Sequence, residues 1–163
     1  MLPRLDILAA EPSGAVDRVD QLRAGYLLNF IKFVEWPAAA EPQGRVLCFV
    51  GGVGIREAIA GAQSRQRSGA SITTRVLSKG ESAAGCQLLY VEADVGSAPD
   101  TSGQPVLTIS DAPDFARHGG MVELFSEGNR LRFNINLEVA RRAGLRISSS
   151  LLQLASHVEE SGR

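Results

Sequence analysis

The sequence predicts a single α/β domain with a mostly parallel central sheet, an antiparallel C-terminal hairpin and flanking helices. Three observations support this fold class. The chain has 163 residues, which is enough to form one core. Its middle part alternates short apolar runs with helical segments. Its last third contains two runs of alternating apolar residues around a tight turn.

The first predicted element is an amphipathic helix over residues 16–35. Apolar residues recur there at steps of three and four: Val16, Val19, Leu22, Tyr26, Phe30, Phe33 and Val34. The helix ends before Trp36-Pro37, because the residue before a proline avoids helical backbone angles. The aromatic-rich stripe either faces the core, which is the commoner meaning, or forms a surface for a ligand or partner. We expect Trp36, beside a loop, at the rim of such a surface.

Four strands are expected in the middle of the chain. The run RVLCFVGG (45–52) is apolar and predicts a strand buried on both faces. A short helix follows at 55–63, and then ASITTRVLS (70–78) is rich in β-branched residues. The remaining two strands are CQLLYVEA (86–93) and PVLTISDA (105–112).

The C-terminal part predicts a hairpin followed by two helical segments. The hairpin is MVELFSEGNRLRFNINLE (121–138), with its turn at Glu127-Gly128-Asn129. A helical connector, EVARRAG, ends at a glycine. Ser150 and Gln153 have the spacing of a capping box and predict a last helix over 151–158.

The first 15 residues show no periodic pattern, so we expect a leader at 1–15, one domain at 16–158 and a tail at 159–163. Asp6 interrupts the apolar run of the leader, which is therefore a poor signal peptide. By this criterion the protein is either cytoplasmic or begins after a removed signal, and both alternatives stay open. No segment approaches the roughly 20 apolar residues of a membrane-spanning helix.

Charge and residue spacing argue against several classes of function. Seventeen basic and 18 acidic residues give a net charge of −1, whereas proteins that bind nucleic acid through its phosphates are usually basic. Histidines and cysteines lack CxxC or HxxxH spacing, so we expect no metal and no cofactor. Ser110, Asp111 and His118 lack the strained elbow of a hydrolase nucleophile. Cys48 lies in an apolar strand, where a thiol is inert. We therefore expect a binding or regulatory protein and not an enzyme.

The glycine-rich turn after the first strand has the layout of a nucleotide-binding loop. Gly52 and Gly54 begin the pattern GxGxxG, but Glu57 occupies its last position, and the GK[ST] of a phosphate loop is absent. A weaker anion or ligand site remains an alternative, because open α/β sheets bind ligands at the carboxyl ends of their strands. Its candidate residues are Gly52, Gly54, Ser110 and Asp111.

Three segments together resemble one protein family: LRAGYLLNFIKFVEWP (22–37), PVLTISDAPDFARHGGMVEL (105–124) and EGNRLRFNINLEVARRAGLRISSSLLQLA (127–155). They are similar, in this order, to the aromatic-rich first helix, the SD-x-x-x-F-x-x-x-GGM segment and the C-terminal block of the YfiR-like family, also called DUF4154. The likeness runs through most of residues 22–158.

The resemblance implies an exported α/β protein of the bacterial periplasm, whose signal peptide has been removed. It implies a regulator that binds the periplasmic domain of a membrane-bound diguanylate cyclase and inhibits it, which lowers cyclic-di-GMP and biofilm formation. Further implied partners are an outer-membrane lipoprotein that sequesters the regulator and a second copy in a homodimer. The competing hypothesis is a periplasmic small-molecule sensor without catalytic activity.

The resemblance also implies a redox-sensitive cysteine pair, Cys48 and Cys86. If the third strand lies beside the first, as in a flavodoxin-like order, their Cα atoms come within the roughly 5.5–6 Å that a disulfide prefers. Two buried free thiols remain the alternative. Some relatives carry a second pair near the hairpin, where this chain has Met121, Leu124 and Phe125. Redox behaviour that needs the second pair cannot operate here.

Overall fold

The protein is described by a computed structural model, which covers residues 17–37, 44–65, 71–95 and 98–160. The predicted leader lies outside these residues, and the predicted tail does so in part. In chain order the elements are α1 (Arg18–Phe33), β1 (Val34–Glu35), β2 (Arg45–Val50), α2 (Val53–Arg65), β3 (Ile72–Val76), β4 (Leu88–Val91), β5 (Leu107–Ser110), β6 (Val122–Glu127), β7 (Arg130–Asn136), α3 (Leu137–Arg142), β8 (Arg146–Ile147), α4 (Ser149–Leu154) and β9 (His157–Glu159).

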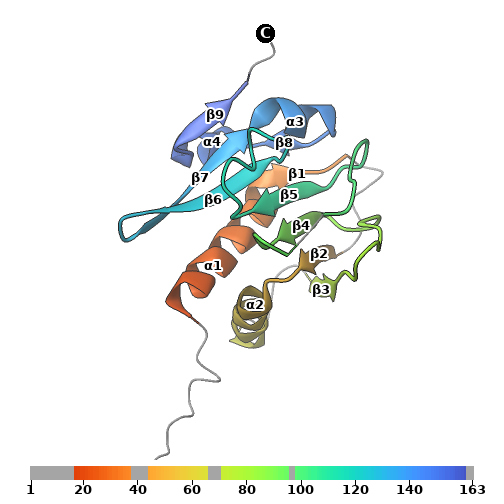
Figure 1. The fold of residues 1–163 in the computed structure, drawn as a ribbon, viewed down its shortest axis with the longest axis vertical. Coiled ribbons are helices and arrows are strands. Elements are labelled where there is room, and N and C mark those ends of the chain that lie inside the picture. The colour runs from red at the N-terminus through yellow and green to blue at the C-terminus, as the bar shows by residue number, and fades with distance from the viewer. Residues whose placement is uncertain (1–16, 38–43, 66–70, 96–97, 161–163) are drawn as a thin grey trace, which may run out of the picture.

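Seven of the described strands form one mixed sheet in the order β3-β2-β4-β5-β6-β7-β9 (Figure 1). All neighbours from β3 to β6 are parallel, whereas β7 runs antiparallel to β6, and β9 is parallel to β7. Strand β4 lies beside β2, with Leu89 opposite Cys48. The predicted fold class is confirmed, including the antiparallel hairpin and the flavodoxin-like position of the third strand.

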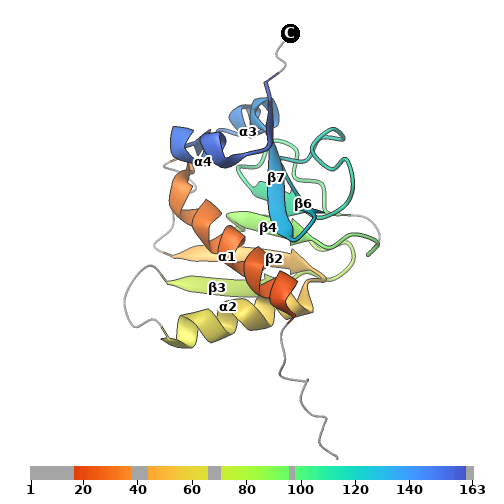
Figure 2. The same cartoon turned by 90° about the vertical axis from the view of Figure 1, so that its left-hand side faces the viewer.

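Helices α1 and α2 lie together on one face of the sheet (Figure 2). The carboxylate of Asp17 caps α1, because it accepts a hydrogen bond from the Val19 N–H at 3.3 Å. One face of α1 is apolar and is turned toward the strands. The residues that it buries are Ala24, Leu27, Phe30 and Ile31.

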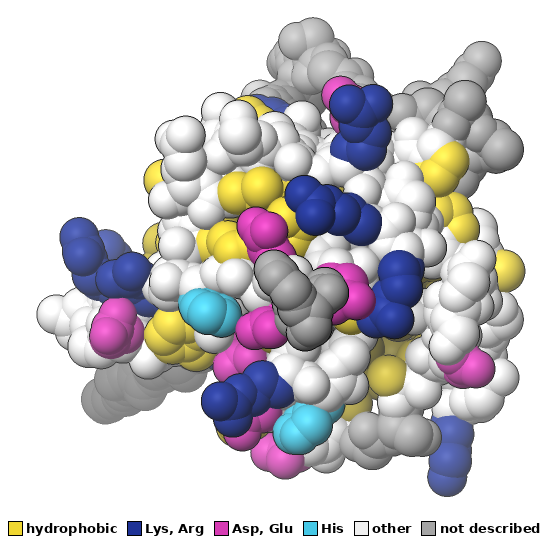
Figure 3. Space-filling view, turned by 90° about the horizontal axis from the view of Figure 1, so that it is seen from above, with side chains coloured by type: hydrophobic (Ala, Val, Ile, Leu, Met, Phe, Trp, Pro, Cys, Tyr) yellow, Lys and Arg dark blue, Asp and Glu magenta, His cyan; other side chains and the backbone are white. Residues whose placement is uncertain are grey.

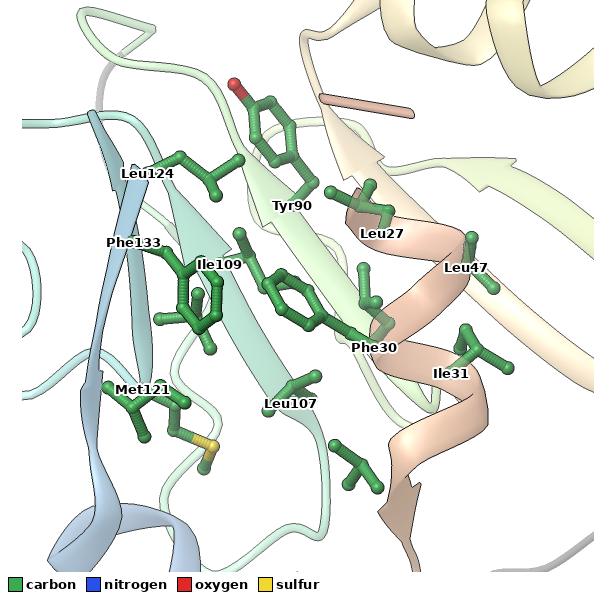
Figure 4. Packing of buried hydrophobic residues seen from close by; sticks show 14 of the residues in the cluster. Leu27, Phe30, Ile31, Leu47, Tyr90, Leu107, Ile109, Met121, Leu124 and Phe133 are labelled. Carbon is green, nitrogen blue, oxygen red and sulfur yellow. The ribbon is translucent and has the colours of Figure 1, made fainter. Parts of the chain in front are cut away.

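The main core lies between α1 and the middle of the sheet (Figure 4). Phe30 of α1 meets Phe133 of β7 edge to face, with ring centroids 5.3 Å apart. Leu27, Leu107 and Ile109 pack around this pair and are fully buried. Truncation of such side chains to alanine typically costs about 2–5 kcal/mol, so this cluster fixes α1 on the sheet.

Residues of connecting loops cover the other face of β2 and β4. A smaller apolar cluster lies there, formed by Cys48, Leu77, Ala83, Cys86, Leu89, Val91 and Val106. Four of its members come from the segments that connect β3 to β4 and β4 to β5. Helices α1 and α2 therefore flank these two strands on one face, and loops complete the core on the other.

The C-terminal segment departs from its prediction. The helix predicted over 151–158 is the shorter α4, and its cap is Ser148, whose Oγ accepts from the Leu151 N–H at 3.1 Å. Ser150 therefore does not cap it. The chain is extended at Ala155, and β9 then pairs with β7, which places Val158 beside Ile135 at the core. Sheet pairing overrides the weak helical pattern here, because it buries apolar surface that one more helical turn would leave exposed.

The first helix also ends earlier than predicted. Helix α1 ends at Phe33, and Val34–Glu35 pairs with Arg146–Ile147 as a small antiparallel sheet. The Ser148 N–H donates to the Phe33 carbonyl at 2.9 Å, which ties α4 to the end of α1. The end of α1 is thus fixed by tertiary pairing two residues before the predicted end of the helix.

Candidate functional site

The glycine turn after β2 is filled by the protein's own carboxylates. The N–H of Gly52, which has a left-handed φ of 71°, donates to Glu92 Oε1 at 2.7 Å. A Cβ at Gly54 would collide with the carboxylate of Asp20 from α1. An external anion at this turn would meet two like charges, and Gly52 has already given its donor to one of them.

Ser110 and Asp111, at the end of β5, are also held by internal hydrogen bonds. The buried Ser110 Oγ accepts from the Ala112 N–H at 3.0 Å. Asp111 accepts from the Ala93 N–H at 2.8 Å and forms an ion pair with Arg23 at 3.3 Å. These contacts join the loop after β4, the end of β5 and helix α1.

Arg23 and Tyr90 complete this network at the carboxyl ends of the strands. The guanidinium of Arg23 bridges Asp111 and Asp20, with the second contact at 3.1 Å. Burial, and next the negative charge of Asp111, raise the pKa of Tyr90 far above its ordinary value. The structure therefore brings the four predicted residues of the ligand site to one end of the sheet, where Gly52, Ser110 and Asp111 make structural hydrogen bonds.

A small cavity of about 340 Å³ lies beside this network, between the β5–β6 loop and the hairpin. Its charged lining consists of Arg23, Asp111, Asp114 and Glu123. The Glu123 carboxylate accepts from the Asp114 N–H at 3.2 Å and from the Ala116 N–H at 3.1 Å. Arg23 Nε is buried and has no hydrogen-bond partner.

Acidic, basic and histidine side chains lie close together at the end of the molecule that carries β9 and α3 (Figure 3). His157 and Glu159 lie there, with His157 Nε2 and Glu159 Oε1 3.3 Å apart and exposed. Across the described ranges, no three histidine, cysteine or carboxylate side chains gather closely enough to hold a metal ion.

Trp36 does not lie at a surface rim, contrary to the prediction. Its side chain is only 5% exposed, and its Nε1 donates to the Gln87 carbonyl at 2.9 Å. The guanidinium carbon of Arg45 lies 5.2 Å from its ring centroid. Trp36 is buried because the chain after α1 turns back over the start of β4, so this indole is part of the core.

Cys48 and Cys86 form a disulfide in the structure. Their Cα atoms are 5.9 Å apart, because β2 and β4 are neighbours in the sheet. Both residues are buried in the smaller apolar cluster. A reductant in solution would reach these sulfurs only after the loops above them open.

A second concave surface is a groove along α1, which the sequence patterns do not reveal. Its volume is about 690 Å³. Its lining comes from α1, the β6–β7 hairpin and α4: Arg18, Leu22, Tyr26, Asn29, Phe30, Phe33, Asn129, Arg130, Leu131, Arg132, Phe133, Leu151 and Leu154. We call this surface the α1 groove. Its size lies within the range of ordinary ligand and peptide sites.

The floor of the α1 groove is rigid and its rim is exposed. Tyr26 packs edge to face on Phe133 with centroids 5.7 Å apart, and its hydroxyl donates to the Leu131 carbonyl at 2.6 Å. On the rim, Leu22 and Phe33 are each 41% exposed, and Leu154 is 70% exposed. One side of the helical stripe thus fills the core, and the other side borders the groove.

The charged side chains of the α1 groove are all basic. They are Arg18, Arg130 and Arg132. Arg132 already contacts Glu127 at 3.2 Å and Ser156 at 2.8 Å. Among the described residues, Arg18 and Arg130 have no ion-pair partner. The groove therefore combines apolar surface with two arginines that have no ion-pair partner in the described part of the chain.

The fold and these surfaces define a small α/β domain with one polar end, held by internal hydrogen bonds, and one open apolar groove. The family model described as DUF4154, YfiR/HmsC-like, matches residues 20–156. The protein belongs to this family, which confirms the resemblance seen in its sequence. No match is found among curated proteins.

Two solved structures share the fold at low sequence identity. A conserved domain protein from Vibrio cholerae has a TM-score of 0.53 at 10% identity, covering 86% of this chain and 60% of its own. An ABC domain from Streptococcus pneumoniae in complex with L-Trp has a TM-score of 0.52 at 15% identity, covering 85% of this chain and 61% of its own. This chain thus spans about 60% of the length of either structure. At such identities the likeness shows the fold alone.

Proposed function

We propose that this protein is a periplasmic regulator that inhibits a membrane-bound diguanylate cyclase by direct contact, thereby lowering cyclic-di-GMP and biofilm formation. The observation that carries the proposal is the match of the YfiR/HmsC-like family model over residues 20–156. The proposed partners are the periplasmic domain of the cyclase, an outer-membrane lipoprotein that releases the inhibition, and a second copy of this chain.

Two structural features support this proposal. The Cys48–Cys86 disulfide suits an oxidising compartment such as the periplasm. The α1 groove offers an exposed apolar surface, and such surfaces mark sites of protein contact. None of the helices in the described ranges has the length and hydropathy needed to cross a bilayer.

A deletion strain tests the proposed function. We expect cellular cyclic-di-GMP to rise when the gene is removed and to return to its original level when an exported copy is restored. A copy that lacks an export signal serves as the control and should leave cyclic-di-GMP high. Unchanged cyclic-di-GMP in the deletion strain would count against the proposal.

A second candidate function is sensing of a small molecule in the 340 Å³ cavity at the carboxyl ends of the strands. The observation that favours it is the charged lining of this cavity, in which Arg23 lies among the carboxylates of Asp111, Asp114 and Glu123. A thermal-shift screen of metabolites tests it, with Arg23→Lys as the matched variant. Stabilisation of the wild type that is lost in Arg23→Lys would support sensing, and no shift with any compound would refute it.

A further inference from the structure

We propose that the α1 groove binds an amphipathic helix of the partner protein, with apolar side chains along one face and carboxylates toward one end. This inference rests on the proposed function and names the surface and the chemistry of its inhibitory contact. Helix-in-groove recognition places the apolar face of such a helix on an apolar floor.

The apolar side chains on the rim of the α1 groove carry the first step of the argument. Among the described residues, six large apolar side chains are exposed, and Leu22, Phe33 and Leu154 all border this groove. Solvent-exposed apolar side chains scattered singly need no explanation, but a cluster around a concave floor marks an interaction site. The proposal therefore assigns these three residues to contact with the partner.

Leu154 shows that this apolar character is not a by-product of core packing. Helix α4 is anchored on the core by Leu151, which is buried, whereas Leu154 lies one turn further along and is 70% exposed. Both residues line the groove. A polar residue at position 154 would leave the packing of α4 on the core intact, so the leucine adds apolar surface to the groove alone.

The length of the groove matches a helix. Its lining residues Arg18, Leu22, Tyr26, Phe30 and Phe33 recur at steps of three and four along the whole of α1. At 1.5 Å per residue, this row is about 22 Å long. A partner helix of about four turns would lie along it.

The charges of the groove determine in which direction the partner helix lies along it. Arg18 begins α1 and Arg130 begins β7, whereas Phe33 and Leu154 end α1 and α4. Tyr26 contacts Leu131 and Phe30 contacts Phe133, so β7 runs along α1 in the same sense and places Arg130 toward the Arg18 end. The groove is therefore basic at one end and apolar at the other.

Helix stability does not account for Arg18. A positive charge at a helix N-terminus is unfavourable, because it meets the positive end of the helix dipole. Arg18 lies in the first turn of α1 and has no ion-pair partner among the described residues. A carboxylate of the partner protein would form an ion pair with Arg18.

A second copy of this chain fits the groove poorly. A twofold interface places the same patch on both sides, so the arginines of one groove would meet a groove that also contains no acidic residue. A bilayer surface is also a poor fit, since the apolar side chains surround a hollow and do not project from one flat face.

Fluorescence anisotropy with two designed peptides tests the inference on the full-length protein. The first peptide is an amphipathic helix of about 16 residues with leucines on one face and glutamates at one end. The second has lysines in place of the glutamates. We expect the glutamate peptide to bind at least about tenfold more tightly than the lysine peptide. Equal affinities, or no binding of either peptide, would overturn the inference.

Three variants refine this experiment. Leu154→Asp should weaken binding of the glutamate peptide by about tenfold or more, and the double variant Arg18→Glu/Arg130→Glu should prefer the lysine peptide. Val53→Asp is the matched control, because Val53 is 56% exposed on α2, away from the groove. Retention of glutamate-peptide binding by the double variant would contradict the charge argument.

The same variants separate this inference from the proposed function. If the wild type lowers cyclic-di-GMP and Leu154→Asp does so equally well, the groove proposal fails and the function stands. If the wild type leaves cyclic-di-GMP unchanged but binds the glutamate peptide selectively, the function fails and the groove proposal stands. Sedimentation that shows a dimer dissociated by Leu154→Asp, or binding to phosphatidylglycerol vesicles lost in that variant, would assign the groove to a second copy or to lipid and overturn the proposal.

Discussion

The carboxyl ends of β2, β4 and β5 and the groove along α1 are both concave, yet only the first is filled by the protein's own polar side chains. At the strand ends, Glu92, Asp20 and Asp111 occupy the positions that a ligand anion would take. In the α1 groove, apolar side chains and two arginines face solvent. At the usual ligand position of an open α/β sheet, this chain's own carboxylates therefore make structural contacts, whereas the apolar groove along α1 stays open.

The largest expected effect on stability concerns the disulfide, which joins β2 to the segment that precedes β4. Replacing both Cys48 and Cys86 by alanine removes a cross-link between residues 38 positions apart. We expect the free energy of unfolding to fall by about 3–4 kcal/mol, measured by urea denaturation. Dithiothreitol should destabilise the wild type and leave the double variant unaffected. A double variant as stable as the wild type would show that the bond contributes nothing.

A smaller loss is expected when the polar network is weakened at Asp111. Asp111→Asn keeps the shape of the side chain but removes the charge that faces Arg23. We expect the free energy of unfolding to fall by about 1–2 kcal/mol in urea denaturation. The control is Glu127→Gln, because Glu127 forms an exposed ion pair with Arg132 and should change stability by less than about 0.5 kcal/mol. Equal losses of stability in the two variants would show that the network around Asp111 contributes no more than an exposed ion pair.

The network also predicts a response to alkaline pH. Burial and Asp111 raise the pKa of Tyr90 in the folded protein, whereas tyrosine titrates near pH 10 in an unfolded chain. The stabilising contribution of the neutral phenol is therefore complete below about pH 10 and is lost as the pH rises above it. Urea denaturation above about pH 10 should show a steeper loss of stability for the wild type than for Tyr90→Phe. Parallel curves would contradict this prediction.

The smallest effect on stability is expected in the α1 groove. Leu154→Asp should change the free energy of unfolding by less than about 0.5 kcal/mol, because the side chain is 70% exposed. Leu151→Ala, on the same helix but buried, should cost about 2–4 kcal/mol. Thermal and urea unfolding of the two variants would measure the difference. A large loss in Leu154→Asp would show that this leucine is part of the core.

The elements with strong local patterns were predictable from the sequence. The apolar runs around Cys48 and Tyr90 lie on central strands, and the turn at Gly128 forms the hairpin. Strand β9 was not predictable, because three residues at a sheet edge carry no periodic signal. Trp36 was misplaced because its burial depends on Arg45 and Gln87, which only the fold brings to it.

The two concave surfaces also differ in how far they can be predicted from the sequence. Sequence motifs placed Gly52, Gly54, Ser110 and Asp111 at the ends of strands, because strand ends follow from local patterns. Two of the carboxylates that fill this region, Asp20 and Glu92, come from distant parts of the chain and have no motif. The α1 groove combines three separate segments, and the apolar stripe of α1 alone does not show which of its residues stay exposed. A stripe wider than one core face is the signal that would have indicated it.

The disulfide has one further consequence, which concerns chain cleavage. The covalent ring closed by Cys48 and Cys86 contains all of α2 and of the edge strand β3. A protease that breaks one peptide bond inside this ring leaves both pieces joined in a single molecule. Edge strand β3 then remains tethered beside β2 and can pair with it again. A nicked chain would stay a single molecule until the disulfide is reduced, which would be a useful property in the oxidising compartment proposed for this protein.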